Sequence, residues 1–430
     1  MSVTSPRAFL AELFDAAVAA AHPSTCVVPH LPAPPASGRL ILLAAGKAAG
    51  SMLETAESYY LDTLGFDPSR LVGIGVARHG YGRPTRQLEM VEAGHPVPDA
   101  AGLRGAQTAI DLAAGAQAGD LVVVLLSGGA SANWIAPAEG VELDDKRALT
   151  RALLRSGANI TEINTVRKHL SRIKGGRLTT LAQPAHVVTL SISDVPGDDP
   201  AVIGSGPTVP DPSTLAEARD VLTRFRIEPA GSIAVALRDP ANESPKPGNA
   251  AFANAEYHLV ARPADSFVAA EKLARAAGIE PILLGDNLEG EAREVAAAQA
   301  ELALKLKAEG KRAVLLSGGE LTVTMRGQGR GGPNQEYALA LAEALAGATG
   351  IYAVAGDTDG TDGGGGDASD PAGAFVMPDT LERARALGLV PAEFLANNDS
   401  TSFFERLGDL LTPGPTYTNV NDFRAVLIDP

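Results

Sequence analysis

Five aspartates follow a single apolar segment of this chain. Residues 351–370 read IYAVAGDTDGTDGGGGDASD, so an apolar run expected to be a strand leads directly into a glycine-rich loop of carboxylates. Oxygen ligands on flexible backbone suit Mg²⁺, which binds through one or two carboxylates together with substrate phosphates. The loop therefore indicates phosphoryl chemistry, and open α/β sheets bind ligands beyond strand ends. A solvated acidic turn or a calcium loop is the alternative, because Asp and Gly are also common in turns.

A lysine stands between a predicted strand and a predicted helix near the N-terminus. In residues 40–52, LILLAAGKAAGSM, Gly46 and Lys47 separate an apolar run from a helix expected to begin at about Ala48. Such a lysine can reach a phosphate that backbone NH groups hold at a helix N-terminus. The segment is not a P-loop, because no glycine stands five positions before Gly46 and Ala48 replaces the hydroxyl residue. A plain surface lysine is the alternative, although a cation there opposes the helix dipole.

Two further glycine loops follow predicted strands. Residues 127–131, SGGAS, have small side chains that leave NH groups free to wrap an anion, although any tight turn between strand and helix looks similar. Residues 194–199 hold three aspartates, among them Asp194, and precede a glycine loop around Ser205. Connecting loops have a median length of about 4 to 6 residues, so this long irregular stretch indicates part of a site.

Residues 313–342 form the fourth segment of interest. Glu320 follows a double glycine, Arg326 and Arg330 lie in a glycine-rich turn, and Asn334 opens a predicted helix. An arginine there can grip a carboxylate or phosphate with two parallel hydrogen bonds.

The same turn imitates a dinucleotide-binding fingerprint. Gly327, Gly329 and Gly332 satisfy GxGxxG between a predicted strand and a predicted helix, and Asp357 ends the next predicted strand. The acidic residue lies farther downstream than is usual, and Arg330 inside the turn suits a metal-bound nucleotide better than a redox cofactor. GxGxxG alone is a weak signal, so a nicotinamide site stays open as an alternative.

Alternating elements must position these loops. Short apolar runs alternate with helical stretches along the chain, which is typical of βαβ units around a mostly parallel sheet. The 430 residues are too many for one ordinary core, so we expect two α/β domains. Pro, Asn, Gly and charges interrupt the pattern between residues 239 and 250, which places the domains at residues 1–240 and 241–430.

Composition narrows the class of protein. A net charge of −15 argues against nucleic acid or an anionic membrane as a partner, because both need a basic surface. The single cysteine, Cys26, excludes an internal disulfide and a cysteine-based zinc site, which fits a cytoplasmic protein. The segment PRAFLAELFDAAVAAAHP, residues 6–23, is expected to form an amphipathic helix rather than a signal peptide, since Glu12 and Asp15 interrupt the apolar run.

Taken together, these segments resemble the glycerate 2-kinase family, some members of which are called hydroxypyruvate reductase. The resemblance covers nearly the whole chain and implies a Rossmann-like, three-layer N-terminal domain, a C-terminal MOFRL α/β domain, and an active site in the cleft between them. It also implies that ATP and Mg²⁺ serve to phosphorylate the C2 hydroxyl of D-glycerate. The matching segments include AAGKAAGSM, EAGHPVPDAAG, LLSGGASAN, INTVRKHLSRIKGGRL, SDVPGDDPAVIGSGPTVPDPST, LLSGGELTV, GRGGPNQE, TDGTDG, LANNDSTSFF and TPGPTYTNVNDFR.

The resemblance places functional residues of the family on Lys47, Glu320 and Asp359, and the other roles below are our interpretation of the loops and basic residues. The expected catalytic residues are Lys47, Glu320, Asp359 and Arg330, with Asp359 or Glu320 orienting the C2 hydroxyl. The expected ATP and phosphate contacts are Gly46, Ser127, Gly128, Gly129, Ser317, Gly318, Gly319 and Asn334. The expected substrate contacts are Arg167, Lys168, Arg326 and Asn398, and the expected metal ligands are Asp194, Asp357 and Asp362.

Some assignments stay open. The family pattern leads us to expect an arginine before the NQE run, but Pro333 stands there, so Arg330 or Arg326 would supply the charge. Similarly, Arg78 stands where a lysine is expected. The basic residues at 167–174 could instead form a solvated helix face, and His95 could be structural.

Two other functions remain in view. A reductase that uses NADH on hydroxypyruvate would employ the GxGxxG turn and need neither ATP nor Mg²⁺. A sensor without catalysis would keep the pockets without turnover, but the chain retains Lys47, Glu320 and Asp359 together. For the kinase we expect only the small-molecule partners D-glycerate and ATP, in a monomer or a homodimer.

Overall fold

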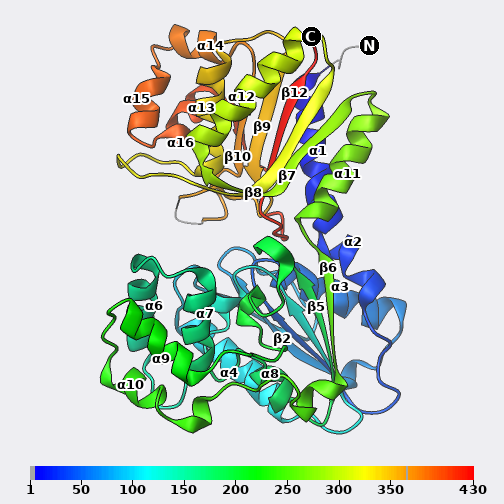
Figure 1. Cartoon of the computed structure of the whole chain (residues 1–430). Helices are drawn as coiled ribbons and strands as arrows, with labels where there is room; N and C mark the ends of the chain where they lie inside the picture. Colours follow the sequence, from blue (N-terminus) through cyan, green and yellow to red (C-terminus); the bar gives the residue numbers. More distant parts are fainter. Residues whose placement is uncertain (1–4, 365–366) are drawn as a thin grey trace. The chain divides into compact units, whose positions relative to one another are not determined.

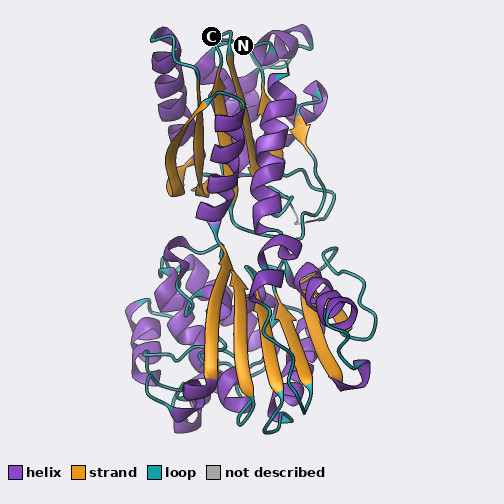
Figure 2. Ribbon diagram, turned by 90° about the vertical axis from the view of Figure 1, so that its right-hand side faces the viewer, coloured by secondary structure: helices purple, strands orange, loops and turns teal. Residues whose placement is uncertain are grey.

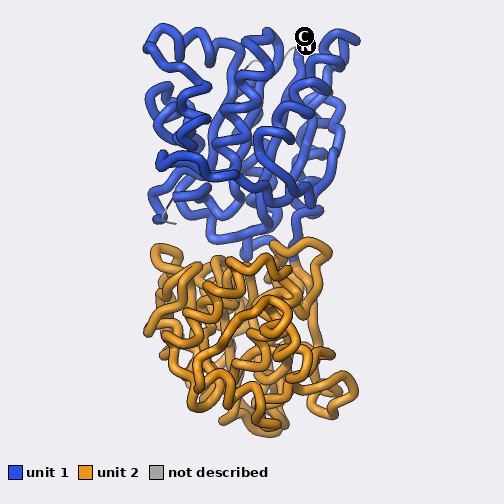
Figure 3. The backbone as a smooth tube through the Cα atoms, turned by 60° about the vertical axis from the view of Figure 1, so that its left-hand side comes forward, with its two compact units in different colours: residues 1–25, 261–430 blue, residues 26–260 orange. Residues whose placement is uncertain are grey.

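The computed structural model describes residues 5–364 and 367–430. It divides into two compact units, drawn in different colours in Figure 3. Unit 1 comprises Met1–Thr25 and Ala261–Pro430, and unit 2 comprises Cys26–Val260. None of the described helices has both the length and the apolar character that crossing a membrane requires.

Unit 2 is built on a six-stranded sheet whose first five strands pair in parallel. Every residue of β4, LVVVLL, is buried, as expected for a parallel strand covered on both faces. In sheet order the strands are β3 (Glu89–Ala93), β2 (Leu71–Arg78), β1 (Leu40–Ala45), β4 (Leu121–Leu126), β5 (His186–Ile192) and β6 (Ala255–Ala261).

This strand order contains a topological switch point. The chain moves from β1 outward to β2 and β3, then crosses back to β4 on the other side of β1. In open α/β sheets, the loops that leave the two strands at such a point diverge and form a ligand-binding crevice. The expectation of a Rossmann-like domain is confirmed, and the carboxyl ends of β1 and β4 are its natural binding site.

Helices cover both faces of this sheet (Figure 2). The helix α4 (Ala100–Ala114) packs on the face that carries Ile41 and Leu43, whereas α3 (Ala49–Ser58) contacts β1 and β2 from the other face. The helices α6 (Leu143–Arg155), α7 (Ile160–His169), α9 (Leu215–Arg224) and α10 (Gly231–Ala236) lie together at one side of unit 2 (Figure 1), and a separate apolar cluster joins them. The other helices of this unit are α5 (Ala130–Asn133) and α8 (Arg177–Leu181), while α2 (Pro23–Cys26) spans the point after Thr25 where the chain passes from unit 1 to unit 2.

Unit 1 has a mixed six-stranded sheet between two helical layers (Figure 1). β12 runs antiparallel to both of its neighbours, β8 and β9, while β7 and β8 are parallel. In sheet order the strands are β11 (Leu410–Leu411), β10 (Gly373–Val376), β9 (Ile351–Asp357), β12 (Asp422–Ile428), β8 (Ala313–Thr322) and β7 (Glu280–Glu291). One face is covered by α1 (Pro6–Ala21) and α11 (Pro263–Ala276), and the other by α12 (Ala292–Ala308), α13 (Pro333–Leu345), α14 (Thr380–Ala386), α15 (Pro391–Ala396) and α16 (Ser400–Leu407).

These compact units differ from the predicted domains 1–240 and 241–430. The amphipathic helix α1 packs on the sheet of unit 1, because its apolar stripe, including Leu10 and Leu13, lies against Phe267 of α11 and Phe423 of β12. At the other boundary, β6 completes the sheet of unit 2, so the chain leaves that unit about twenty residues later than expected. Both differences arise from contacts between distant segments, which local composition does not encode.

Candidate active site

Two loops meet at the switch point of unit 2, where β1 and β4 end. The backbone NH of Lys47 donates to the carbonyl of Gly128 (2.7 Å), and the NH of Ala48 donates to Ser127 Oγ (2.9 Å). Gly46 has a φ of +119°, and an added Cβ would lie only 2.3 Å from Ser127 Oγ. Only glycine fits at position 46, because the two loops approach each other closely there. The structure brings Gly46, Lys47 and residues 127–129 together, while their roles toward a phosphate stay predictions.

The turn after β4 also carries a neighbouring histidine. Gly129 has a φ of +83°, and a Cβ there would stand 3.0 Å from the His95 ring and 3.3 Å from the Lys47 side chain. Lys47 and His95 are both half-buried beside this turn. Asp194 follows β5, the next strand of the sheet, so it lies at the same edge. No role is predicted for His95 from the sequence, where its only signal is the matching segment EAGHPVPDAAG around it.

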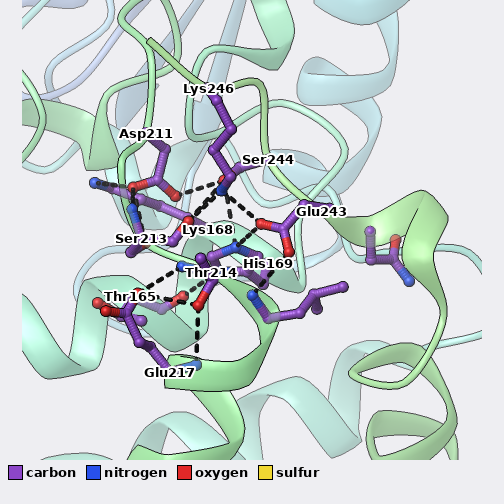
Figure 4. Close-up of polar contacts among 12 residues, drawn as sticks. Thr165, Lys168, His169, Asp211, Ser213, Thr214, Glu217, Glu243, Ser244 and Lys246 are labelled. Carbon is purple, nitrogen blue, oxygen red and sulfur yellow. Dashed lines mark hydrogen bonds and ion pairs between the residues drawn. The ribbon is translucent and has the colours of Figure 1, made fainter.

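Lys168 is engaged in a buried polar network at the end of α7 (Figure 4). Its Nζ lies 3.4 Å from Asp211 Oδ1, and Asp211 Oδ2 accepts a hydrogen bond from Ser244 (2.9 Å). The next residue, His169, is fully buried, and its Nε2 contacts Glu243 Oε1 (3.0 Å). This network ties residues 243–246 to α7. It disfavours the predicted contact between Lys168 and substrate.

Arg167, on the same helix, is in a different situation. Its guanidinium is partly buried, yet it makes no hydrogen bond or ion pair within residues 5–364 and 367–430. Burial lowers the pKa of Arg167 below its usual value, since desolvation penalises the charged form. A partly buried cation without a protein partner is unfavourable, and an anionic ligand would relieve that cost. Of the two predicted basic contacts on α7, the structure therefore favours Arg167.

A second group of polar residues lies in unit 1, where β8 and β9 approach their ends and β12 begins. Arg424 of β12 is completely buried, and its Nη1 lies 2.8 Å from Asp422 Oδ2. It also donates to the carbonyl of Gly318 and to Asn334 Oδ1. Arg424 thereby ties β8 to the start of α13, which explains the burial of Asn334. Arg424 is not among the residues predicted from the sequence, although an arginine in the apolar run DFRAVLI is a usable signal.

The double glycine before Glu320 differs from its prediction. Residues 317–319 were expected at a strand end, but they lie inside β8, which continues to Thr322. Gly319 has a φ of +96°, and a Cβ there would lie 2.2 Å from the backbone of Leu288 in β7. These glycines serve the irregular pairing of β7 with β8, and Ser317 Oγ contacts Gln299. Such contacts disfavour Ser317, Gly318 and Gly319 as a phosphate cradle.

The TDGTDG loop folds into successive aspartate turns after β9. Asp357 Oδ1 accepts from the NH of Asp359 (2.9 Å), and Asp359 Oδ1 accepts from the NH and the hydroxyl of Thr361 (2.8 and 3.0 Å). Asp359 is buried, whereas Asp357 is half-buried and Glu320 of β8 is exposed. The loop thus places Asp357 at the end of its strand, beside Asp422 in the neighbouring strand.

Asp362 takes a structural role in place of the predicted metal contact. Its Oδ1 accepts from the NH of Asn334 (3.0 Å), and its Oδ2 accepts from the NH and Nε2 of Gln335 (2.9 and 3.1 Å). It therefore caps the N-terminus of α13. Burial, reinforced by Asp422, raises the pKa of Asp362 to about 7 despite these donors.

The described carboxylates are not clustered around a possible metal site. Among residues 5–364 and 367–430, no three or more His, Cys, Asp or Glu side chains are grouped so that they could hold one. Mg²⁺ does not need such a cage, because it is commonly bound through one or two carboxylates and substrate phosphates. Asp194 and Asp357, each at a strand end, fit this mode, whereas Asp362 does not.

The glycine-rich turn before α13 is shaped by Asn398. Its Oδ1 accepts from the NH groups of Arg326 (2.7 Å) and Gly327 (2.9 Å), and its Nδ2 donates to Glu336 (3.3 Å). Arg330 is exposed and pairs with Glu405 (2.7 Å). These contacts make Asn398 an organiser of the turn, and they leave Arg326 and Arg330 on its outer side.

Comparisons with known proteins agree with this architecture. Residues 9–238 match the family model described as Domain of unknown function (DUF4147), and residues 313–422 match the MOFRL family. The D-glycerate 2-kinase of Thermotoga maritima is 40% identical over 91% of this chain and 91% of its own. This chain belongs to the glycerate 2-kinase family.

A solved structure and a second named relative are also similar to this chain. The crystal structure of glycerate kinase from Thermotoga maritima aligns with a TM-score of 0.86 at 38% identity, covering 98% of this chain and 99% of that one. A protein of Agrobacterium vitis named putative hydroxypyruvate reductase is 47% identical over 99% of this chain and 95% of its own. Glycerate 2-kinase relatives therefore include proteins with a reductase name.

Proposed function

We propose that this protein is a glycerate 2-kinase, a phosphotransferase that moves a phosphoryl group from ATP to the C2 hydroxyl of D-glycerate and yields 2-phospho-D-glycerate. The observation that carries the proposal is the position of Lys47. In a chain of this family, it stands at the switch point of the sheet against the turn of residues 127–129. We further propose a cytoplasmic location and a monomer or homodimer without nucleic acid or membrane partners.

Phosphoryl transfer needs positioned charges more than covalent participation by the protein. Lys47 supplies a compact positive charge for the transferred phosphate, and Arg167 offers its guanidinium to the carboxylate of glycerate. Asp359 or Glu320 orients the C2 hydroxyl for attack. Mg²⁺, held by Asp194 or Asp357, would neutralise charge on the phosphate oxygens.

Phosphorus NMR of the purified protein with D-glycerate, ATP and Mg²⁺ tests this proposal. We expect the signal of 2-phosphoglycerate, because the assay reports the reaction and the position of the phosphate together. A 3-phosphoglycerate signal would keep the kinase but overturn the assigned position, and the absence of any product would refute the kinase.

The relatives named putative hydroxypyruvate reductase make that activity the second candidate. The proposed reductase would need the GxGxxG turn to approach a pyrophosphate. Residues 397–399 already pack against these glycines. A Cβ added at Gly327 would lie 2.4 Å from Asn397, and one added at Gly329 would lie 2.3 Å from Asp399. We therefore expect no oxidation of NADH in the presence of hydroxypyruvate, and steady turnover of NADH would favour the reductase.

A further inference from the structure

A buried serine in unit 2 adopts a backbone conformation that favours glycine. Gly204, Ser205 and Gly206 have φ values of 59°, 63° and 58°, so three successive residues are left-handed. A non-glycine residue held in that region costs about 1 to 3 kcal/mol, whereas glycine adopts it freely. Both neighbours are glycine, yet Ser205 is not, although it is completely buried. The strain is tolerated where the side chain contributes something that glycine lacks.

The Ser205 hydroxyl joins two parts of the candidate site. It lies 2.7 Å from Ser131 Oγ and donates to Asn164 Oδ1 (3.1 Å). Ser131 belongs to α5, which begins directly after the turn beside Lys47. Asn164 belongs to α7 and precedes Arg167 by three residues, so the two lie on the same side of that helix.

Ser131 itself is held firmly in place. The buried Nζ of Lys174 donates to the carbonyls of Ser131 (2.8 Å) and Trp134 (3.0 Å), which fixes the short helix α5 at both ends. On the other side, the carbonyl of Ser205 accepts from the NH of Gly175 (3.1 Å). The bridge through Ser205 therefore connects anchored segments, and a change in its length would move α7 relative to the turn.

We propose that Ser205 is a positioning residue that sets Arg167 relative to the turn beside Lys47, and thereby aligns the carboxylate of the acceptor with the phosphate that it attacks. This inference rests on the proposed kinase function. The two charged ends of the reaction lie on separate elements, α7 and the loops after β1 and β4. A misplacement of about 1 Å between reacting groups can cost on the order of 100-fold in rate.

Ser205→Gly tests the proposal, because it removes the hydroxyl and the backbone strain together. We expect kcat/KM for D-glycerate to fall by about 10- to 100-fold, with KM for ATP changed by less than about twofold. Thermal unfolding should change little, since the relieved strain offsets the lost hydrogen bonds. Ser205→Ala keeps the strain, so it should lose the same activity and also unfold at a lower temperature.

Two controls complete the experiment. Ala346→Gly relieves a left-handed residue at the end of α13, far along the chain from these groups, and should leave the kinetics unchanged. Ser131→Ala combined with Ser205→Gly should cost no more than either change alone, because both break one bridge. Wild-type kcat/KM for D-glycerate in Ser205→Gly, or equal losses for both substrates, would overturn the proposal. Absence of kinase activity in the wild type would instead refute the proposed function.

Discussion

Lys47 lies beside a turn that has no room for a side chain at Gly46, and at Gly129 a Cβ would press on the Lys47 stem at 3.3 Å. Packing against this turn restricts the aliphatic part of the Lys47 side chain, and therefore restricts where its ammonium group can lie. Lys47→Met keeps the stem and removes the charge. We expect kcat to fall on the order of 1000-fold while the fold persists, since an electrostatic contact at a developing charge is worth that much. Steady-state kinetics with circular dichroism would measure it, and Lys272→Met at an exposed position is the control. Unchanged kinetics in the folded variant would remove Lys47 from the mechanism.

Asp359 allows the two roles of a carboxylate to be separated. Asp359→Asn retains an oxygen that can accept from Thr361, so the turn should survive. If Asp359 orients the hydroxyl, kcat falls by about 100-fold or more at every Mg²⁺ concentration. A metal ligand would instead raise the Mg²⁺ concentration that half-maximal activity requires. Titration of activity with Mg²⁺ distinguishes the two, and we expect the first result.

The partly buried guanidinium of Arg167 predicts opposite effects on stability and binding. Arg167→Met removes a charge that has no protein partner within the described residues, so the free protein should be at least as stable. KM for D-glycerate should rise by about 10-fold or more, because a charge-assisted hydrogen bond to the carboxylate is lost. Lys168→Met is the matched control: it breaks the pair with Asp211 and should lower the melting temperature. A destabilised Arg167→Met with normal KM would contradict the assignment.

Among the elements, α13 depends on a carboxyl that belongs to a distant loop. Burial raises the pKa of Asp362 to about 7, well above the value of about 4 in an unfolded chain. Between these values the folded state holds a proton that the unfolded state has lost. The contribution of this group to the free energy of unfolding is therefore complete below pH 4 and declines as pH rises toward 7. We expect Asp362→Asn to flatten this part of the stability profile, measured by urea unfolding at several pH values. An identical slope in both proteins would contradict the raised pKa.

Strands were predicted from the sequence more accurately than the residues that contact them. The strands before Lys47, Ser127 and Asp357 were recognisable, because apolar runs end there in glycine turns. The cap that Asp362 places on α13 was not, because the two segments are 28 residues apart and only folding brings them together. The double glycine at residues 318–319 was misplaced for the same reason, since its conformation is set by pairing with β7.

In the candidate site, too, the sequence indicated the loops but not the contacts between distant residues. Gly46 and Ser127 were grouped in the sequence analysis as expected phosphate contacts, and the loops that carry them do meet where β1 and β4 end, but their role in binding phosphate stays a prediction. The roles of Arg424, Ser205 and Asn398 depend on which groups face them, and no periodicity in the sequence reports that. Local pattern therefore located the loops, while long-range packing decided which side chains are structural and which remain available to a ligand.

In the chain as a whole, unit 1 is not one continuous stretch of sequence. Unit 1 uses residues from both ends of the chain, so the chain passes between the units twice, near residues 25 and 260. The core between α1, α11 and the sheet of unit 1 cannot form until the C-terminal part is present. The stability of unit 1 should therefore depend on residues that precede unit 2 in the sequence.

Leu13→Ala tests this arrangement. Leu13 is completely buried in the core that also contains Val354 and Phe423, and truncating such a leucine costs about 2 to 5 kcal/mol. Hydrogen exchange should then accelerate in β8, β9 and β12, while β1 and β4 keep the protection of the wild type, because the units have separate cores. Leu154→Ala, at an exposed position on α6, should change neither. If the substitution at Leu13 instead accelerated exchange in β1 and β4, α1 would have to stabilise the unit that follows it in the sequence, and the division of the chain at residue 25 would be wrong.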